Sequence, residues 1–136
     1  MPKPIELAVD GLPPAKAEAL SMLGAAHKHA PRVLALLEAA KRAIEAGARP
    51  LGDVPVGLEL ALHCRRDRNR SDATNYLGGN ADVLEGKSHR VGAIDHLGEL
   101  AAVHLYDNDR QIERISFAWH DAERPSYRLI LSGLKS

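Results

Sequence analysis

The chain has 136 residues, of which 45% are hydrophobic and 26% charged, and these values predict one globular domain over residues 1–136 rather than two domains or a disordered chain. Its 18 basic residues equal its 18 acidic residues, so the net charge gives no general attraction to nucleic acid or to a membrane surface. The single cysteine, Cys64, excludes an internal disulfide framework, and with no membrane-length apolar run a cytoplasmic protein with no membrane partner is predicted.

The first half of the chain reads as a strand, a helix and a second strand. Apolar and polar residues alternate over residues 5–9, and a Gly-Leu-Pro-Pro turn ends that strand. Residues 15–30 fit either a loop or a short helix. Apolar residues then recur at helical spacing over residues 31–47, beginning with a first-turn proline. Alternation over residues 54–64 predicts the second strand, which leads into an arginine-rich run.

Residues 70–87, RSDATNYLGGNADVLEGK, predict a second helix. At about 100° per residue, its apolar residues fall within one quadrant and its polar ones on the other side, so one face packs and the other stays open. The expected packed face holds Ala73, Leu77, Ala81 and Leu84. The expected open face holds Asp72, Asn75, Gly79 and Asp82.

The remainder of the chain predicts mostly loop over residues 85–99, with a short helical turn near residues 94–97, and then three strands. These strands cover residues 100–106, 112–120 and 127–131, and the first two are joined by DNDRQ, which is short enough for a hairpin. The element order predicts a single α/β domain with a mixed sheet of about five strands and two main helices.

Three charged features are expected to lie near one another in this fold. They are the basic run Arg65, Arg66, Arg68 and Arg70, the acidic and amide face at Asp72, Asn75 and Asp82, and the turn Asp107-Asn108-Asp109. Magnesium is usually held by one or two carboxylates, with water and substrate phosphate filling the other positions. Carboxylates beside arginines are therefore typical of a metal-dependent phosphodiesterase, in which metal-activated water attacks phosphate.

Each feature also has a structural interpretation, which the sequence leaves open. Asp72 after Ser71 is an ordinary helix N-cap, and Asp107-Asn108-Asp109 is a common turn composition. The arginine run fits a solvated loop, since Asp67 dilutes its charge. The pair His27 and His29 lacks partner cysteines, which argues against zinc.

The order of these features resembles that of the RusA-type endonucleases, which resolve four-way Holliday junctions. Members of that family carry an arginine-rich strand end, then Asp-x-Asp-Asn and a helix ending in Asp-Ala-Leu, then a strand leading into Asp-Asp-x-Gln. The matching text here is RNRSDATNYLGGNADVL at 68–84 and VHLYDNDRQIERISF at 103–117. The resemblance covers most of the chain, and it implies a RusA-like fold, branched DNA as substrate, Mg²⁺ or Mn²⁺ as cofactor and a homodimer.

Five positions agree with the family pattern and three depart from it. The agreeing residues are Asp72, Asn75, Asp82, Asp109 and Gln111. The departures are Thr74 in place of the second motif aspartate, Gly78 in place of a helix lysine, and Asn108 in place of the first aspartate of the acidic pair. A threonine hydroxyl is a much weaker metal ligand than a carboxylate, and loss of the lysine removes a cation that can stabilise transition-state charge.

Two main readings follow, and a third remains. The first is a divergent metal-dependent endonuclease, with Asp72, Asp109 and Asn75 as catalytic residues and with Asp82 or Asp107 joining Asp72 and Asp109 as metal ligands. The second is a non-catalytic protein on the same fold that binds nucleic acid through the arginine run. The third is a small interaction or regulatory domain, which the balanced charge favours.

Overall fold

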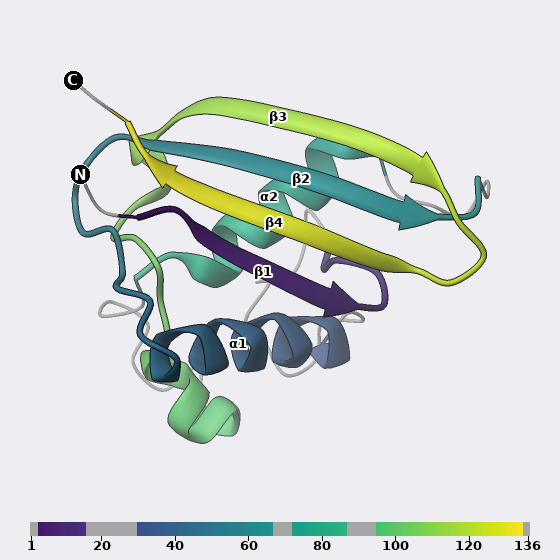
Figure 1. The fold of residues 1–136 in the computed structure, drawn as a ribbon. Helices are drawn as coiled ribbons and strands as arrows, with labels where there is room; N and C mark the ends of the chain where they lie inside the picture. The colour runs from purple at the N-terminus through teal and green to yellow at the C-terminus, as the bar shows by residue number, and fades with distance from the viewer. Residues whose placement is uncertain (1–2, 16–29, 67–71, 87–94, 135–136) are drawn as a thin grey trace.

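A computed structural model describes residues 3–15, 30–66, 72–86 and 95–134, coloured along the chain in Figure 1. In these ranges the chain forms an α/β fold with a single sheet, two α-helices and two short 3-10 helices. The elements in chain order are β1 (Ile5–Asp10), α1 (Ala30–Glu45), β2 (Val56–Cys64), α2 (Ala73–Leu84), η1 (Asp95–Ala102), η2 (Asp109–Gln111), β3 (Ile112–Asp121) and β4 (Ser126–Gly133).

The four strands form one mixed sheet in the order β1, β4, β2, β3 (Figure 1). β4 runs antiparallel to both of its neighbours, whereas β2 and β3 are parallel. A parallel pair needs a connection that returns from one end of the sheet to the other, and α2 lies in that connection. As a result β2 and β3 begin at the same end of the sheet and finish at the same opposite end. The charged residues before β3 and those after β2 therefore lie at different ends of the sheet.

One face of the sheet carries the hydrophobic core. Its most deeply buried side chains come from three strands and are Ile5 and Leu7 of β1, Leu58, Leu60 and Leu62 of β2, and Leu129 and Leu131 of β4. Full burial of one such leucine stabilises the fold by about 2 kcal/mol relative to exposure. The opposite face carries charged residues such as Glu59 and Arg128, and neither α-helix lies on it (Figure 1).

The helix predicted over residues 31–47 is confirmed as α1. It buries Val33, Leu36, Leu37 and Ala40, and it runs beside β1 (Figure 1). Among the described residues, no helix combines the length and the apolar character that a bilayer crossing requires.

The packed face of α2 differs from the predicted one. Asp72 and Asn75 are exposed as expected, but Gly79, placed on the open face by the sequence, is buried together with Tyr76 and Asn80. A side chain at position 79 would place its Cβ 2.0 Å from the backbone oxygen of Pro14. The glycine therefore lets the chain after β1 approach the helix closely, and this contact rotates the buried face away from the apolar quadrant.

The strand predicted over residues 100–106 does not form, so the sheet has four strands rather than about five. Asp95–Ala102 is the 3-10 helix η1, which bends at Gly98 with φ 58°. Of the following residues, Val103, Leu105 and Tyr106 are buried, but the Leu105 N–H donates to the Leu84 carbonyl at 2.9 Å, and the only strand-like pairing of Tyr106 in the described ranges is an isolated bridge with Glu85. The apolar residues of this segment are buried as the pattern indicates, but the segment bonds to the end of α2 instead of to β3.

Candidate functional site

The basic residues lie at the end of β2. Arg65 and Arg66 directly follow this strand and are both exposed. The Arg66 guanidinium lies 4.2 Å from the centroid of the Trp119 ring, a cation–π contact that fixes the arginine over β3. Arg68 and Arg70 lie outside the described residues, as do His27 and His29. Two of the four predicted DNA-contacting arginines are thus placed, and both are available at the surface.

A pair of stacked histidines lies on the open face at the same end of the sheet. His63 of β2 and His120 of β3 are register partners, and their ring centroids are 4.8 Å apart with an interplanar angle of 18°. Sequence reasoning missed this pair because the two residues are far apart in the chain and meet only through the parallel register. It adds a flat ring surface two residues from Arg65.

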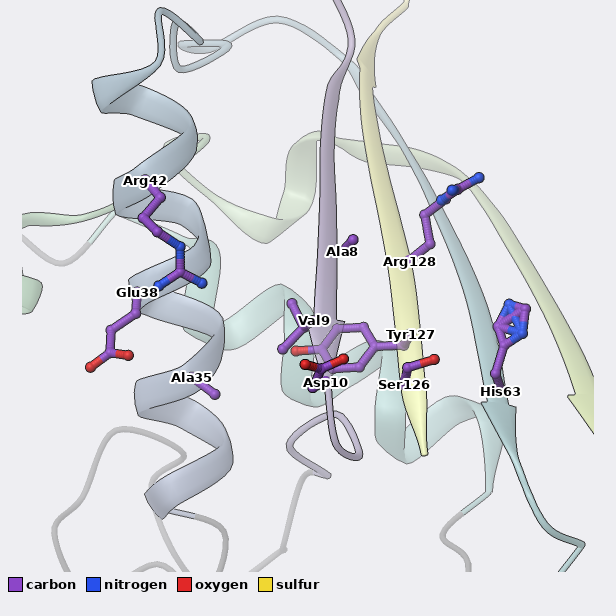
Figure 2. Close-up of a pocket in the computed structure, with 10 residues that line it drawn as sticks. All are labelled: Ala8, Val9, Asp10, Ala35, Glu38, Arg42, His63, Ser126, Tyr127 and Arg128. Atoms are coloured by element: carbon purple, nitrogen blue, oxygen red, sulfur yellow. The ribbon is translucent and has the colours of Figure 1, made fainter. Parts of the chain in front are cut away.

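A cavity of about 530 Å³ reaches from this region toward α1 and β1 (Figure 2). Its wall includes Arg42 and Arg128 but also Asp10 and Glu38, so its charges are mixed. The Tyr127 ring extends from β4 toward β1 (Figure 2), and its buried hydroxyl has no hydrogen-bond partner among the described residues. Burial raises the pKa of this phenol, so it stays neutral.

Asp72 is the N-cap of α2. Its Oδ1 accepts the backbone N–H of Asn75 at 2.8 Å and the hydroxyl of Thr74 at 2.9 Å. These bonds, from Asn75 first and Thr74 second, lower the pKa of the Asp72 carboxyl. Thr74 therefore helps to hold Asp72 in its capping role. The capping interpretation of Asp72 is confirmed, and the Asn75 contact is made by its backbone.

Asp109 lies at the other end of α2. Its backbone N–H donates to the carboxylate of Glu85 at 2.8 Å, and Glu85 is the C-cap residue of the helix. Glu85 is thirteen positions after Asp72, which at 1.5 Å of rise per residue is about 20 Å along the helix axis. Asp72 and Asp109, the two carboxylates expected to share a metal, are thus held at opposite helix ends.

The turn before β3 is built around Gln111. Its Oε1 accepts the N–H groups of Asp107 and Asn108 at 3.0 and 2.7 Å. Its Nε2 donates to the carbonyls of Gly52 and Val54, each at 2.7 Å. Asn108 caps η2, because its side-chain oxygen accepts the N–H of Arg110 at 2.9 Å. This turn is therefore tied to the segment that enters β2.

The charges of three carboxylates act on a buried tyrosine at this end. The Tyr106 hydroxyl donates to the carbonyl of Ala81. Burial raises the pKa of Tyr106, and the negative charges of Glu85, Asp109 and Asp82 raise it further. Asp82 and Asp109 are therefore in the same neighbourhood, with Glu85 as a third member that sequence reasoning did not single out.

The acidic residues do not fit a shared metal centre. In the described ranges, no three histidine, cysteine, aspartate or glutamate side chains are arranged to hold a metal ion. Asp72 is committed to its helix cap, and the Asp107 side chain is exposed. The four predicted metal ligands, Asp72, Asp82, Asp107 and Asp109, are divided between the two ends of α2, so no catalytic step can be drawn through one ion bound by all of them.

The expectation that the arginine run, the whole acidic face of α2 and the turn Asp107-Asn108-Asp109 lie near one another is wrong, because Asp82 and the turn lie at the end of α2 away from Asp72. Gln111 is bonded to Val54, just before β2, whereas Arg65 follows the last residue of β2. The strand spans about 26 Å at 3.3 Å per residue. The chain therefore has a basic end, at Arg65 and Arg66, and an acidic end, at Asp82, Glu85 and Asp109. The sequence does contain a sign that this turn has a structural role, because Asn108-x-x-Gln111 has the spacing of a capping box.

Comparison with known proteins finds no family model that matches the chain and no curated protein that is significantly similar to it.

Proposed function

We propose that this chain is a RusA-like protein that binds branched DNA through the basic end and does not cleave it. The single observation that carries the non-catalytic assignment is the separation of Asp72 from Asp109 by the length of α2. Because a divalent ion binds its oxygen ligands at about 2.0 to 2.6 Å, carboxylates at opposite ends of a rigid helix cannot act on one phosphate together.

The binding role is supported by the geometry of the arginines. Arg65 and Arg66 are exposed at a strand end, where a nucleic-acid backbone can approach them. The guanidinium of Arg66 is held over Trp119, so less side-chain entropy is lost when it contacts a phosphate. By sequence, Arg68 and Arg70 continue the same positive run. Four arginines in six residues give this segment a local excess of positive charge, although the net charge of the chain is zero.

A binding assay on a labelled four-way junction and on a linear duplex tests this role. We expect the junction to bind more tightly than the duplex and to dissociate with rising salt, because phosphate contacts release counterions. The double variant Arg65→Ala/Arg66→Ala should weaken binding and lower the salt slope by about two, one for each lost phosphate contact. The matched control is Arg49→Ala/Arg110→Ala, which removes the same charge from exposed positions near the acidic end.

The same assay, run with Mg²⁺ or Mn²⁺ and with a chelator, tests the absence of cleavage. Intact junction in both metals is the expected result. Metal-dependent nicking that is lost in Asp109→Asn would overturn the non-catalytic role and restore the endonuclease reading. Equal binding by the arginine variant and its control would overturn the assignment of the basic end, and no binding at moderate salt would leave the interaction-domain reading.

A further inference from the structure

The outer edge of β3 is open to pairing. β3 is the last strand of the sheet, and no described strand or helix covers its outer side (Figure 1). Because alternate residues of a strand direct their backbone groups to opposite sides, about half of the N–H and C=O groups in this strand point away from β2. Edge strands are commonly protected by charged side chains, above all lysine, by proline or by short length. β3 is ten residues long and contains neither lysine nor proline, and its charged residues Glu113, Arg114 and Asp121 leave the central stretch from Ile115 to Trp119 uncharged.

An apolar strip runs along the same strand. Ile115, Phe117 and Trp119 pair in register with the core residues Leu58, Leu60 and Leu62 and so share their face. The leucines are at most 2% exposed, whereas Ile115 is 57% exposed and the two aromatic residues are half-buried. The core face of the sheet is thus left partly uncovered at β3, beside the open edge.

We propose that β3 pairs antiparallel with β3 of a second copy of this chain, with the two-fold axis at Ser116. The two sheets then join into one, with their core faces on the same side. In this register Ile115 lies opposite Phe117 of the partner subunit, and the reverse pair is generated by symmetry. The four side chains form a central apolar cluster, and such cross-strand aromatic pairs stabilise sheets.

Charge complementarity selects this register. It places Glu113 opposite Trp119 of the partner subunit, and the partner's Trp119 carries the partner's Arg66 over its ring. A carboxylate is thereby brought toward a guanidinium at each end of the interface. An axis at Phe117 would instead set Glu113 against Asp121 of the partner subunit, and like charges directly opposite are unfavourable. An axis at Ile115 would set Phe117 against the partner's Glu113 and lose the apolar cluster.

The pairing also changes the relation between the two ends of the chain. β3 begins directly after Gln111 at the acidic end and finishes beside Arg66 at the basic end. Antiparallel pairing sets the start of one β3 beside the finish of the other. The acidic end of each subunit then adjoins the basic end of its partner, whereas the described residues of a single chain keep the two ends apart.

Disulfide trapping tests the register. In the proposed dimer Ser116 faces its own copy, and directly opposed residues have Cα atoms about 4.5 to 5.5 Å apart, within disulfide range. Ser116→Cys should give a covalent dimer under mild oxidation. The matched control is Ala118→Cys on the same face of β3, whose two copies would lie about 13 Å apart along the strands. Equal trapping of both variants, or of neither, would overturn the register.

Sedimentation equilibrium, without DNA, tests the association itself. We expect a dimer that Ile115→Lys weakens about tenfold or more, since it places a charge in the centre of the interface. Glu113→Arg and Arg66→Glu should each weaken the dimer, and the two together should restore it. A wild-type monomer at all concentrations, or a dimer that Ile115→Lys leaves unchanged, would overturn the proposal. Since Ile115 is largely exposed, circular dichroism should show that the variant remains folded. The result is independent of whether the protein binds DNA.

Discussion

The two ends of α2 use the same kinds of polar side chains in different ways. At the N-terminal end of α2, a single exposed carboxylate, Asp72, caps the helix, and the exposed arginines Arg65 and Arg66 precede it in the chain. At the other end, Glu85 is 8% exposed and accepts the Asp109 N–H, while Gln111 makes four hydrogen bonds. Within a single chain, the acidic end is a structural junction, and the basic end is the part left available for a ligand.

A cluster of acidic and amide residues is therefore not by itself evidence of a metal site. The N–H and C=O groups of a turn need partners when they are partly buried, and carboxylate and amide oxygens provide them. Asn108 and Gln111 each meet that need. The same composition therefore predicts a catalytic turn or a capped one, and only the partners of each atom distinguish them.

The largest expected effect is on stability at the acidic end. Gln111→Ala removes four hydrogen bonds that tie the turn before β3 to residues Gly52 and Val54. We expect a loss of about 2 to 3 kcal/mol in the free energy of unfolding, measured by urea titration. Arg110→Ala, at the exposed neighbouring position, should stay within about 0.5 kcal/mol of wild type. Equal effects of the two variants would mean that the Gln111 bonds do not hold the turn.

Two tyrosine-to-phenylalanine variants compare what a buried hydroxyl contributes to stability at the acidic end and near the basic end. Tyr106→Phe removes the buried donor to the Ala81 carbonyl and should cost about 1 to 2 kcal/mol. Tyr127→Phe removes a buried hydroxyl that has no partner among the described residues, so it should be neutral or stabilising. Thermal unfolding of both variants measures the contrast. A comparable loss in Tyr127→Phe would show that its hydroxyl is bonded in solution.

The smallest expected effect concerns the pH dependence of the Asp72 cap. Hydrogen bonds from Asn75 and Thr74 lower the pKa of Asp72 in the folded state. The ionised carboxylate therefore contributes stability above its unfolded value of about 3.9, and this contribution disappears as the pH falls through the lowered folded value. Asp72→Asn keeps a capping oxygen but cannot ionise, so its stability difference from wild type should shrink from pH 6 toward about pH 2. A constant difference would contradict this role.

Much of the fold follows from local pattern. Four predicted strands and both helices form near their predicted positions, because alternation and helical spacing directly report which side chains face the core. The strand predicted over 100–106 is wrong because a segment with buried apolar residues can also bond to the end of a helix. The sequence pattern shows which residues are buried but not which segment they pair with. The buried face of α2 misled because Gly79 contacts Pro14, a contact between residues distant in sequence.

Local sequence patterns were enough to predict the α/β class, most element boundaries and the presence of one basic and one acidic group of residues. Contacts between distant segments place these groups at opposite ends of β2 and α2, make β3 parallel to β2, and leave β3 as an edge strand of the sheet that the described residues form. The physical reason is that periodicity depends on a few neighbouring residues, whereas strand order and the separation of side chains depend on contacts between distant parts of the chain.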